Sequence, residues 1–230
     1  MPFFIGDYYY WIIVIPLIIL CFAAQSYVKS TFKKFSNNTV NYLDANKAVD
    51  IVLSRAGCPE IPISKIEGNL TDHYDPRTNT ISLSAGVYGS NSVSAVGVAA
   101  HEAGHAVQEA KSYLPIKIRS AIAPAANLTS SFAPIMIIIG FLFSFDFLIN
   151  LGLIFFIVVV AFYFVTLPVE INASRRAVRS LSDSGYMTAE ELAGVKKVLT
   201  AAALTYVAAA ALALGNLLRF FLLSRGRNRN

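Results

Sequence analysis

Residues 121–167 have the sequence AIAPAANLTSSFAPIMIIIGFLFSFDFLINLGLIFFIVVVAFYFVTL. The stretch holds no lysine or arginine, and its one acidic residue, Asp146, lies near the middle, close to Asn150. A helix needs about 20 apolar residues to cross a bilayer, so this stretch is too long for one crossing and long enough for two. It predicts a transmembrane hairpin with a polar turn, and therefore an α-helical membrane protein.

A second apolar stretch, YYYWIIVIPLIILCFAA, occupies residues 8–24 and carries no charge. It begins with four aromatic residues, which are typical of the membrane interface. No basic region precedes it and no convincing small-residue cleavage site follows it, so it predicts an uncleaved anchor rather than a signal peptide. The composition agrees, because 14% of the 230 residues are charged, against about one quarter in soluble domains.

A third apolar stretch, TAAALTYVAAAALALGNLL at residues 200–218, is long enough to cross a bilayer but rich in alanine. It continues a helix that is predicted to begin at a capping box formed by Thr188 and Glu191. This helix either spans the membrane or packs against it from the cytoplasmic side. The second arrangement is favoured, because a full crossing would place the basic tail RGRNRN outside.

Basic residues flank the apolar stretches and predict the orientation of the chain. The net charge of +5 is spread over small clusters and forms no single basic face, so nucleic acid is not an expected partner. Clusters follow both the anchor and the hairpin: Lys29, Lys33, Lys34, Arg175, Arg176 and Arg179. The positive-inside rule therefore predicts that the polar segment between them faces the cytoplasm, in what we expect to be a bacterial cytoplasmic membrane.

The polar segment, residues 27–120, predicts a small α+β domain. TVNYLDANKAVDIVLSRAG (39–57) has apolar residues at helical spacing and ends at Gly57, a helix terminator. IPISKIEGNLTDHYDPRTNTISLS (61–84) alternates around two turn signals and predicts three short strands in an antiparallel sheet. SNSVSAVGVAAHEAGHAVQEA (90–110) starts with capping candidates and predicts a buried helix.

The predicted helix at residues 90–110 contains the candidate catalytic and metal-binding residues. His101 and His105 lie four residues apart, so both imidazoles leave one helix face and can bind one tetrahedral ion. Glu102 is rotated by about 100° and can reach a water on that ion, which is the HExxH arrangement of zinc peptidases. Ala103 and Gly104 would let a substrate or a strand approach closely. The alternative is a pair of histidines that satisfy each other, or backbone groups, in a core.

A catalytic zinc site needs a third protein ligand. The candidates are His73 and the carboxylates, of which Glu170 in TLPVEINASRRA (166–177) stands out at the end of the second hairpin span. A carboxylate there is costly unless it is paired or metal-bound. The alternative is an ion pair with Arg175 or Arg176. His73 could also stabilise an oxyanion, or could simply be a hydrogen-bonded strand residue.

The segments VAAHEAGHAVQ and LPVEINASRRA, with LTDHYDPRTNTISLS upstream, resemble the neutral zinc metallopeptidases of bacterial membranes, the YugP-like family. The likeness covers nearly the whole chain, and its order of elements is more distantly similar to the HtpX group of membrane gluzincins. The resemblance implies one Zn²⁺ ion held by His101, His105 and Glu170, with Glu102 as the base. The ExxAD motif of the distant relatives aligns with Glu170, Ala173 and Ser174. Candidates for orienting the ligands are Asn172, Ser174 and Arg175.

The predicted protein is thus an α-helical integral membrane protein with a small α+β zincin-like domain. Its expected parts are an anchor (1–26), a zincin-like segment (27–120), a hairpin (121–168), a third-ligand helix (169–187) and an alanine-rich helix with its tail (188–230). The predicted function is zinc-dependent hydrolysis of peptides or membrane proteins. The resemblance to zinc peptidases implies that the substrate adds as an extended strand beside TISLS (80–84). A non-proteolytic zinc-binding scaffold or chaperone-like protein is the alternative. Glu102 favours the enzyme, because a structural zinc site does not need it.

Overall fold

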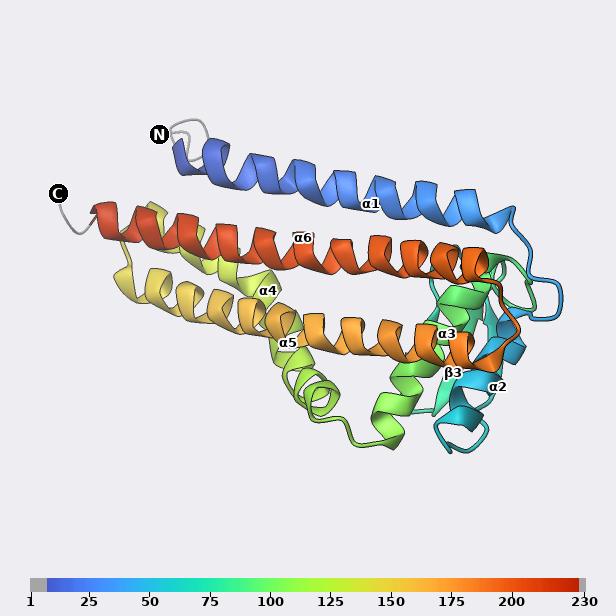
Figure 1. The fold of residues 1–230 in the computed structure, drawn as a ribbon. Coiled ribbons are helices and arrows are strands. Elements are labelled where there is room, and N and C mark those ends of the chain that lie inside the picture. The colour runs from blue at the N-terminus through green and yellow to red at the C-terminus, as the bar shows by residue number, and fades with distance from the viewer. Residues whose placement is uncertain (1–7, 228–230) are drawn as a thin grey trace. The chain divides into compact units, whose positions relative to one another are not determined.

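The computed structural model describes residues 8–227, so the first residues of the predicted anchor and the last three of the basic tail lie outside the described part. The chain forms two compact units. We call residues 8–24, 118–167 and 205–227 the membrane unit, and residues 25–117 and 168–204 the polar unit. The elements in chain order (Figure 1) are η1 (Tyr10–Val14), α1 (Ile15–Ser36), α2 (Ala45–Arg55), β1 (Ile63–Ile66), β2 (His73–Asp75), β3 (Thr80–Ser84), α3 (Val93–Ala110), α4 (Leu114–Phe143), α5 (Asp146–Ser184) and α6 (Ala189–Arg227).

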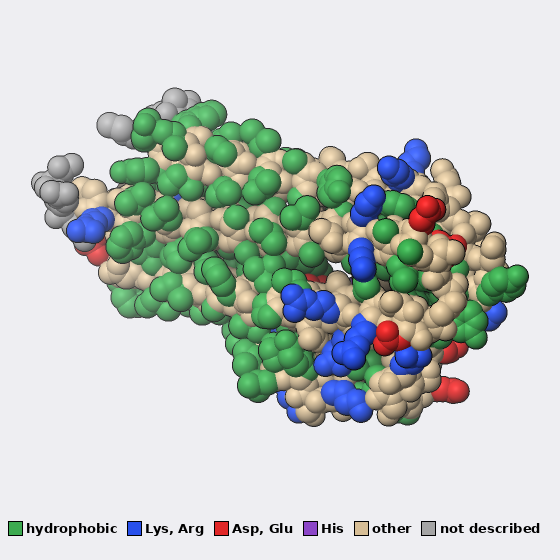
Figure 2. All heavy atoms as spheres, viewed as in Figure 1, with side chains coloured by type: hydrophobic (Ala, Val, Ile, Leu, Met, Phe, Trp, Pro, Cys, Tyr) green, Lys and Arg blue, Asp and Glu red, His purple; other side chains and the backbone are tan. Residues whose placement is uncertain are grey.

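Within residues 8–227, four helical segments are long and apolar enough to cross a membrane: Tyr10–Ser36, Leu114–Phe143, Asp146–Ser184 and Ala189–Gly226. Their large apolar side chains point outward, with Phe22 66% and Phe147 74% exposed. On the face shown in Figure 2, hydrophobic side chains cover the helices of the membrane unit, whereas lysines and arginines gather on the polar unit. Such a surface is stable in lipid and not in water. The chain is an α-helical integral membrane protein with a small α+β unit.

The structure has the predicted helix–turn–helix. The turn between α4 and α5 contains Ser144, whose φ of 60° lies in the left-handed region. Glycines let the two helices pack closely. A Cβ on Gly140 would lie 2.9 Å from the backbone nitrogen of Ile149, and one on Gly152 would lie 3.0 Å from the carbonyl oxygen of Ala133. The hairpin is therefore held by backbone-to-backbone packing as well as by its apolar composition.

One predicted boundary and the predicted course of one helix differ from the structure. Helix α5 is continuous over 39 residues, so the predicted third-ligand helix (169–187) is not separate: residues 169–184 are the end of the second hairpin helix (Figure 1). Helix α6 starts at the predicted capping box, in which Thr188 N donates to Glu191 Oε2 at 2.7 Å and Glu191 N donates to Thr188 Oγ1 at 3.2 Å. It then also runs unbroken for 39 residues. A helix without a break does not re-enter, so α6 is a fourth candidate span.

The polar unit contains the three predicted strands, but one pairing differs from the prediction. The order is β1–β3–β2, with β2 antiparallel and β1 parallel to β3, so the sheet is mixed. The strand TISLS is β3, the central strand, and it has neighbours on both sides. Helices α2 and α3 share one apolar core with this sheet, in which Val49, Ile81, Leu83 and Val96 have no exposed surface. The edge strands of the sheet are β1 and β2, and β2 is the edge strand that contacts α3. TISLS has no free edge.

Candidate metal centre

Helix α3 presents the HExxH residues from a fixed position. Its N-cap is Ser92, whose side chain accepts a hydrogen bond from Ala95 N at 3.2 Å. Half of the 18 residues of the helix are alanine, glycine or serine, and these small residues let it lie buried against α2 and the sheet. The first imidazole, His101, is partly buried, whereas Glu102 and His105 are buried.

Gly104 brings α5 to this face of α3. A Cβ at this position would lie 2.6 Å from the carbonyl oxygen of Ala173, closer than side chains approach a backbone. At Gly104 the close neighbour is therefore α5, and not the substrate or strand that the sequence predicted. This close approach brings Glu170 to the two histidines, because Glu170 lies about one helical turn before Ala173 on α5.

Three donor atoms converge here. His101 Nε2 lies 3.2 Å and His105 Nε2 lies 3.5 Å from Glu170 Oε2, and the two Nε2 atoms are 3.1 Å apart. A tetrahedral ion with bonds of about 2.0–2.1 Å places its ligand atoms about 3.3 Å from each other. Two imidazole nitrogens and one carboxylate oxygen are also a donor set that zinc prefers. The three residues therefore fit one zinc ion, and they form a possible metal-binding group among the described residues.

Each histidine has a partner on its other ring nitrogen. Ser174 Oγ lies 3.1 Å from His101 Nδ1, and Gln108 Oε1 lies 3.1 Å from His105 Nδ1. An amide oxygen only accepts, so His105 carries its proton on Nδ1 in this contact and presents the lone pair of Nε2 to the shared centre. Such partners fix the orientation of metal-binding imidazoles.

The side-chain amide of Gln108 is fixed by further hydrogen bonds to α5. Its Nε2 donates to the carbonyl oxygen of Val169 at 2.8 Å and to Asn172 Oδ1 at 3.1 Å. Arg176 Nε donates to the same Asn172 oxygen at 2.8 Å. The sequence prediction included Asn172 but missed Gln108. The signal that could have identified it is a glutamine three residues after His105, on the same face of an alanine- and valine-rich helix; in the structure this glutamine is fully buried.

Glu102 lies beside the three donors without being one of them. Its Oε2 accepts a hydrogen bond from Tyr74 N of β2 at 3.0 Å. Burial raises the pKa of the Glu102 carboxyl above its ordinary value, and the two imidazoles oppose part of that rise. A carboxyl group in this environment is suited to hold and release a proton.

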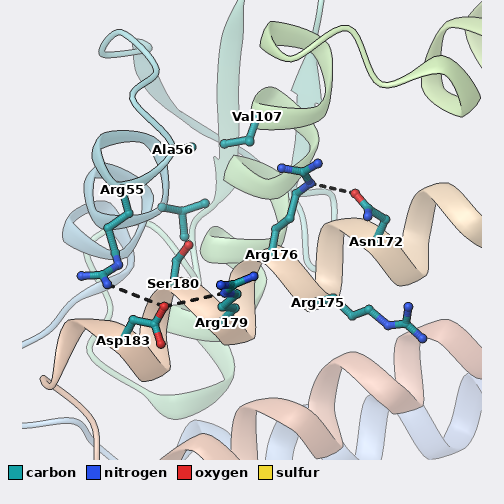
Figure 3. A pocket seen from close by; sticks show the side chains of 10 residues that line it. Arg55, Ala56, Val107, Asn172, Arg175, Arg176, Arg179, Ser180 and Asp183 are labelled. Atoms are coloured by element: carbon teal, nitrogen blue, oxygen red, sulfur yellow. Dashed lines mark hydrogen bonds and ion pairs between the residues drawn. The ribbon is translucent and has the colours of Figure 1, made fainter.

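The other predicted residues lie elsewhere. His73 is exposed on β2, and its Nδ1 donates to the carbonyl oxygen of Thr71 at 2.9 Å. Asn172, Arg175 and Arg176 line a cavity of about 480 Å³ in the polar unit, which Figure 3 shows. There Asp183 lies 3.6 Å from Arg55 and 3.8 Å from Arg179. Among the predicted supporting residues, the structure brings Ser174 to a ligand directly and Asn172 through Gln108.

Comparison with known proteins identifies the family of the chain. Residues 10–225 match the model of a family described as "Putative neutral zinc metallopeptidase". The chain belongs to this family. It is 42% identical over 217 residues to the "Putative membrane protease YugP" of Bacillus subtilis, covering 92% of this chain and 95% of that protein. No solved structure matches the chain. The match to this zinc metallopeptidase family extends from η1 into the last turns of α6, so it includes both helices that carry the candidate metal centre.

Proposed function

We propose that this chain is a membrane-embedded zinc peptidase in which His101, His105 and Glu170 hold the ion. The observation that carries the proposal is the convergence of three donor atoms, 3.1–3.5 Å apart, beside a buried glutamate that is not one of them. A purely structural zinc site would have no use for such a glutamate and would usually complete its ligands with cysteine or histidine. The family membership supports the same activity.

Glu102 is proposed as the general base. A bound zinc ion supplies Lewis acidity and lowers the pKa of a water molecule to about 7. Glu102 takes the proton of the attacking water and passes it to the amine that leaves. Tyr74 N holds one carboxylate oxygen in place, so the carboxyl group keeps one orientation through both proton transfers.

The outer edge of β2 is proposed as the substrate-binding edge. In the β2–β3 ladder Tyr74 lies opposite Ile81, yet its N–H goes to Glu102, so this edge of β2 faces the proposed base. An extended peptide can add to a free edge through backbone hydrogen bonds. The central strand β3 cannot take this role, because β1 and β2 already pair with it. This corrects the predicted docking beside TISLS.

The polar unit is proposed to face the cytoplasm of a bacterium, because the basic clusters after the anchor and after the hairpin belong to it. If α6 crosses the bilayer, the chain after it lies on the opposite side. A reporter fused after Asn230 should then be external. A cytoplasmic signal from that reporter would contradict α6 as a span.

The test compares Glu102→Gln with Glu109→Gln, a matched change seven residues along the same helix. The wild type and both variants are purified in detergent, and their zinc content and their cleavage of casein or a peptide are measured. We expect Glu102→Gln to keep its zinc and lose cleavage by a factor of about 100 or more, whereas Glu109→Gln keeps both. Equal cleavage by all three proteins would refute the role of Glu102. A wild type that binds zinc and cleaves nothing would favour the scaffold alternative.

A further inference from the structure

A groove lies between α5 and α6 in the polar unit, with a volume of about 540 Å³. Ligand sites of small molecules have volumes of about 300–1,000 Å³. Its apolar surface comes from residues such as Ile171, Val178 and Leu199. Its charged side chains include three cations, Arg175, Arg179 and Lys196. The lining is thus amphipathic, with more positive than negative charge.

The cations are only partly neutralised. Asp183, which also lines the groove, lies 3.8 Å from Arg179 and 3.6 Å from Arg55. Within the described residues, neither Arg175 nor Lys196 has a carboxylate at ion-pair distance. Figure 3 shows that Arg175 extends away from the neighbouring Arg176 and from Asp183. Two uncompensated cations in one groove attract an anion.

The apolar lining decides what kind of anion fits. A free phosphate would contact the cations and leave Ile171 and Leu199 uncovered, whereas a ligand with a hydrocarbon part would cover them and gain from the burial. The side chain of Ile171 is 39% exposed and offers further apolar surface. The groove therefore suits a molecule that joins a phosphate to an acyl chain.

The walls of the groove are the two helices that continue into candidate spans. Ile171 follows the last residue of the membrane unit on α5, Leu167, by about one turn, and Ala203 of the lining precedes Thr205, where the membrane unit resumes on α6. Basic pockets between transmembrane helices on the cytoplasmic side bind anionic headgroups. We propose that this groove binds an anionic phospholipid. Arg175 and Lys196 hold its phosphate, and Ile171 and Leu199, which lie nearer the spans along their helices, contact its acyl chain.

The test uses the full-length protein without zinc, so its outcome does not depend on the proposed peptidase activity. Native mass spectrometry and thermal unfolding measure binding of phosphatidylglycerol and of phosphatidylcholine. The test variant is Arg175→Gln with Lys196→Gln, and the control is Lys65→Gln with Lys111→Gln, two exposed lysines of the same unit outside the groove. We expect wild type and control to prefer phosphatidylglycerol, and the test variant to bind it about tenfold or more weakly.

Other outcomes would overturn the proposal. An equal loss in the control variant would show a general effect of charge. Equal competition by inorganic phosphate would show an anion site without a lipid. Binding of an acidic peptide in place of phosphatidylglycerol would make the groove a peptide-binding site. A further variant, Ile171→Ser, should weaken binding of the long-chain lipid more than binding of glycerol phosphate, and equal effects on both would also contradict an acyl-chain contact.

Discussion

The substitution Gly104→Ala should disrupt the metal centre without touching a metal ligand. Its new Cβ would lie 2.6 Å from the Ala173 carbonyl oxygen, whereas ordinary contacts begin at 3.4 Å. The neighbouring atom belongs to backbone, so α3 and α5 must separate or rotate by roughly 0.8 Å, the difference between the two distances. Metal–ligand distances in a working site vary by only about 0.2 Å. Because Glu170 is on the displaced helix, its oxygen would no longer match the two imidazoles.

We therefore expect Gly104→Ala to weaken zinc binding by a factor of about 10 or more. Overpacking should also cost about 1–3 kcal/mol of folding free energy, of which the better helix propensity of alanine offsets about 1 kcal/mol. Zinc affinity is measured by competition with a chelator in detergent, and stability by thermal unfolding of the zinc-free protein.

The matched control is Gly97→Ala, on the same helix and also buried. There the nearest atom to a new Cβ is a methyl group of Val195 at 3.2 Å, which needs to move by only a few tenths of an ångström. Zinc affinity should stay at the wild-type value, and the stability should be unchanged or slightly higher. If Gly104→Ala binds zinc as tightly as Gly97→Ala, the close packing of α3 on α5 does not set the position of Glu170.

Three further changes test the same centre. Glu170→Ala should lower the zinc content of the purified protein, and an unchanged content would mean that the third ligand lies elsewhere. Gln108→Leu should weaken zinc binding about 10–100-fold by releasing His105, and wild-type affinity would remove Gln108 from the site. Burial alone would lower the pKa of His105, but the Glu170 and Glu102 carboxylates outweigh it and raise that pKa above its usual range. Protons should therefore begin to compete with zinc for His105 at a higher pH than they would for an ordinary histidine. The zinc dissociation constant should rise as the pH falls through and below neutrality. A constant dissociation constant from pH 8 to 6 would contradict this.

The parts of the fold that depend on local pattern were predictable. Long uncharged stretches predict membrane helices whatever their neighbours are, and the capping box at Thr188 and Glu191 marks the start of α6. The pairing of strands is not local. Alternation identifies three strands, but it holds no information on which of them lies in the centre, so the parallel β1–β3 pair was missed.

The residues of the candidate site likewise include some that local sequence predicts and one whose position depends on tertiary packing. His101, Glu102 and His105 are close in sequence, and the helix period alone places them together. The distance between α3 and Glu170 depends on packing at Gly104, and the sequence gives no sign of which segment fills that space. The predicted boundary near Pro168 followed a change from apolar to polar residues, whereas the backbone of α5 continues through it.

The continuity of α5 constrains how this chain can evolve. Each residue inserted into a helix turns everything after it by about 100°. One extra residue between Glu170 and Ala173 would point Glu170 away from the imidazoles while Ala173 stays packed against Gly104. The spacing between the carboxylate and Ala173 must therefore stay constant, even where the length of the span before Glu170 changes to match the bilayer. The metal centre restricts insertions in one short part of α5 and leaves the apolar half free to vary in length.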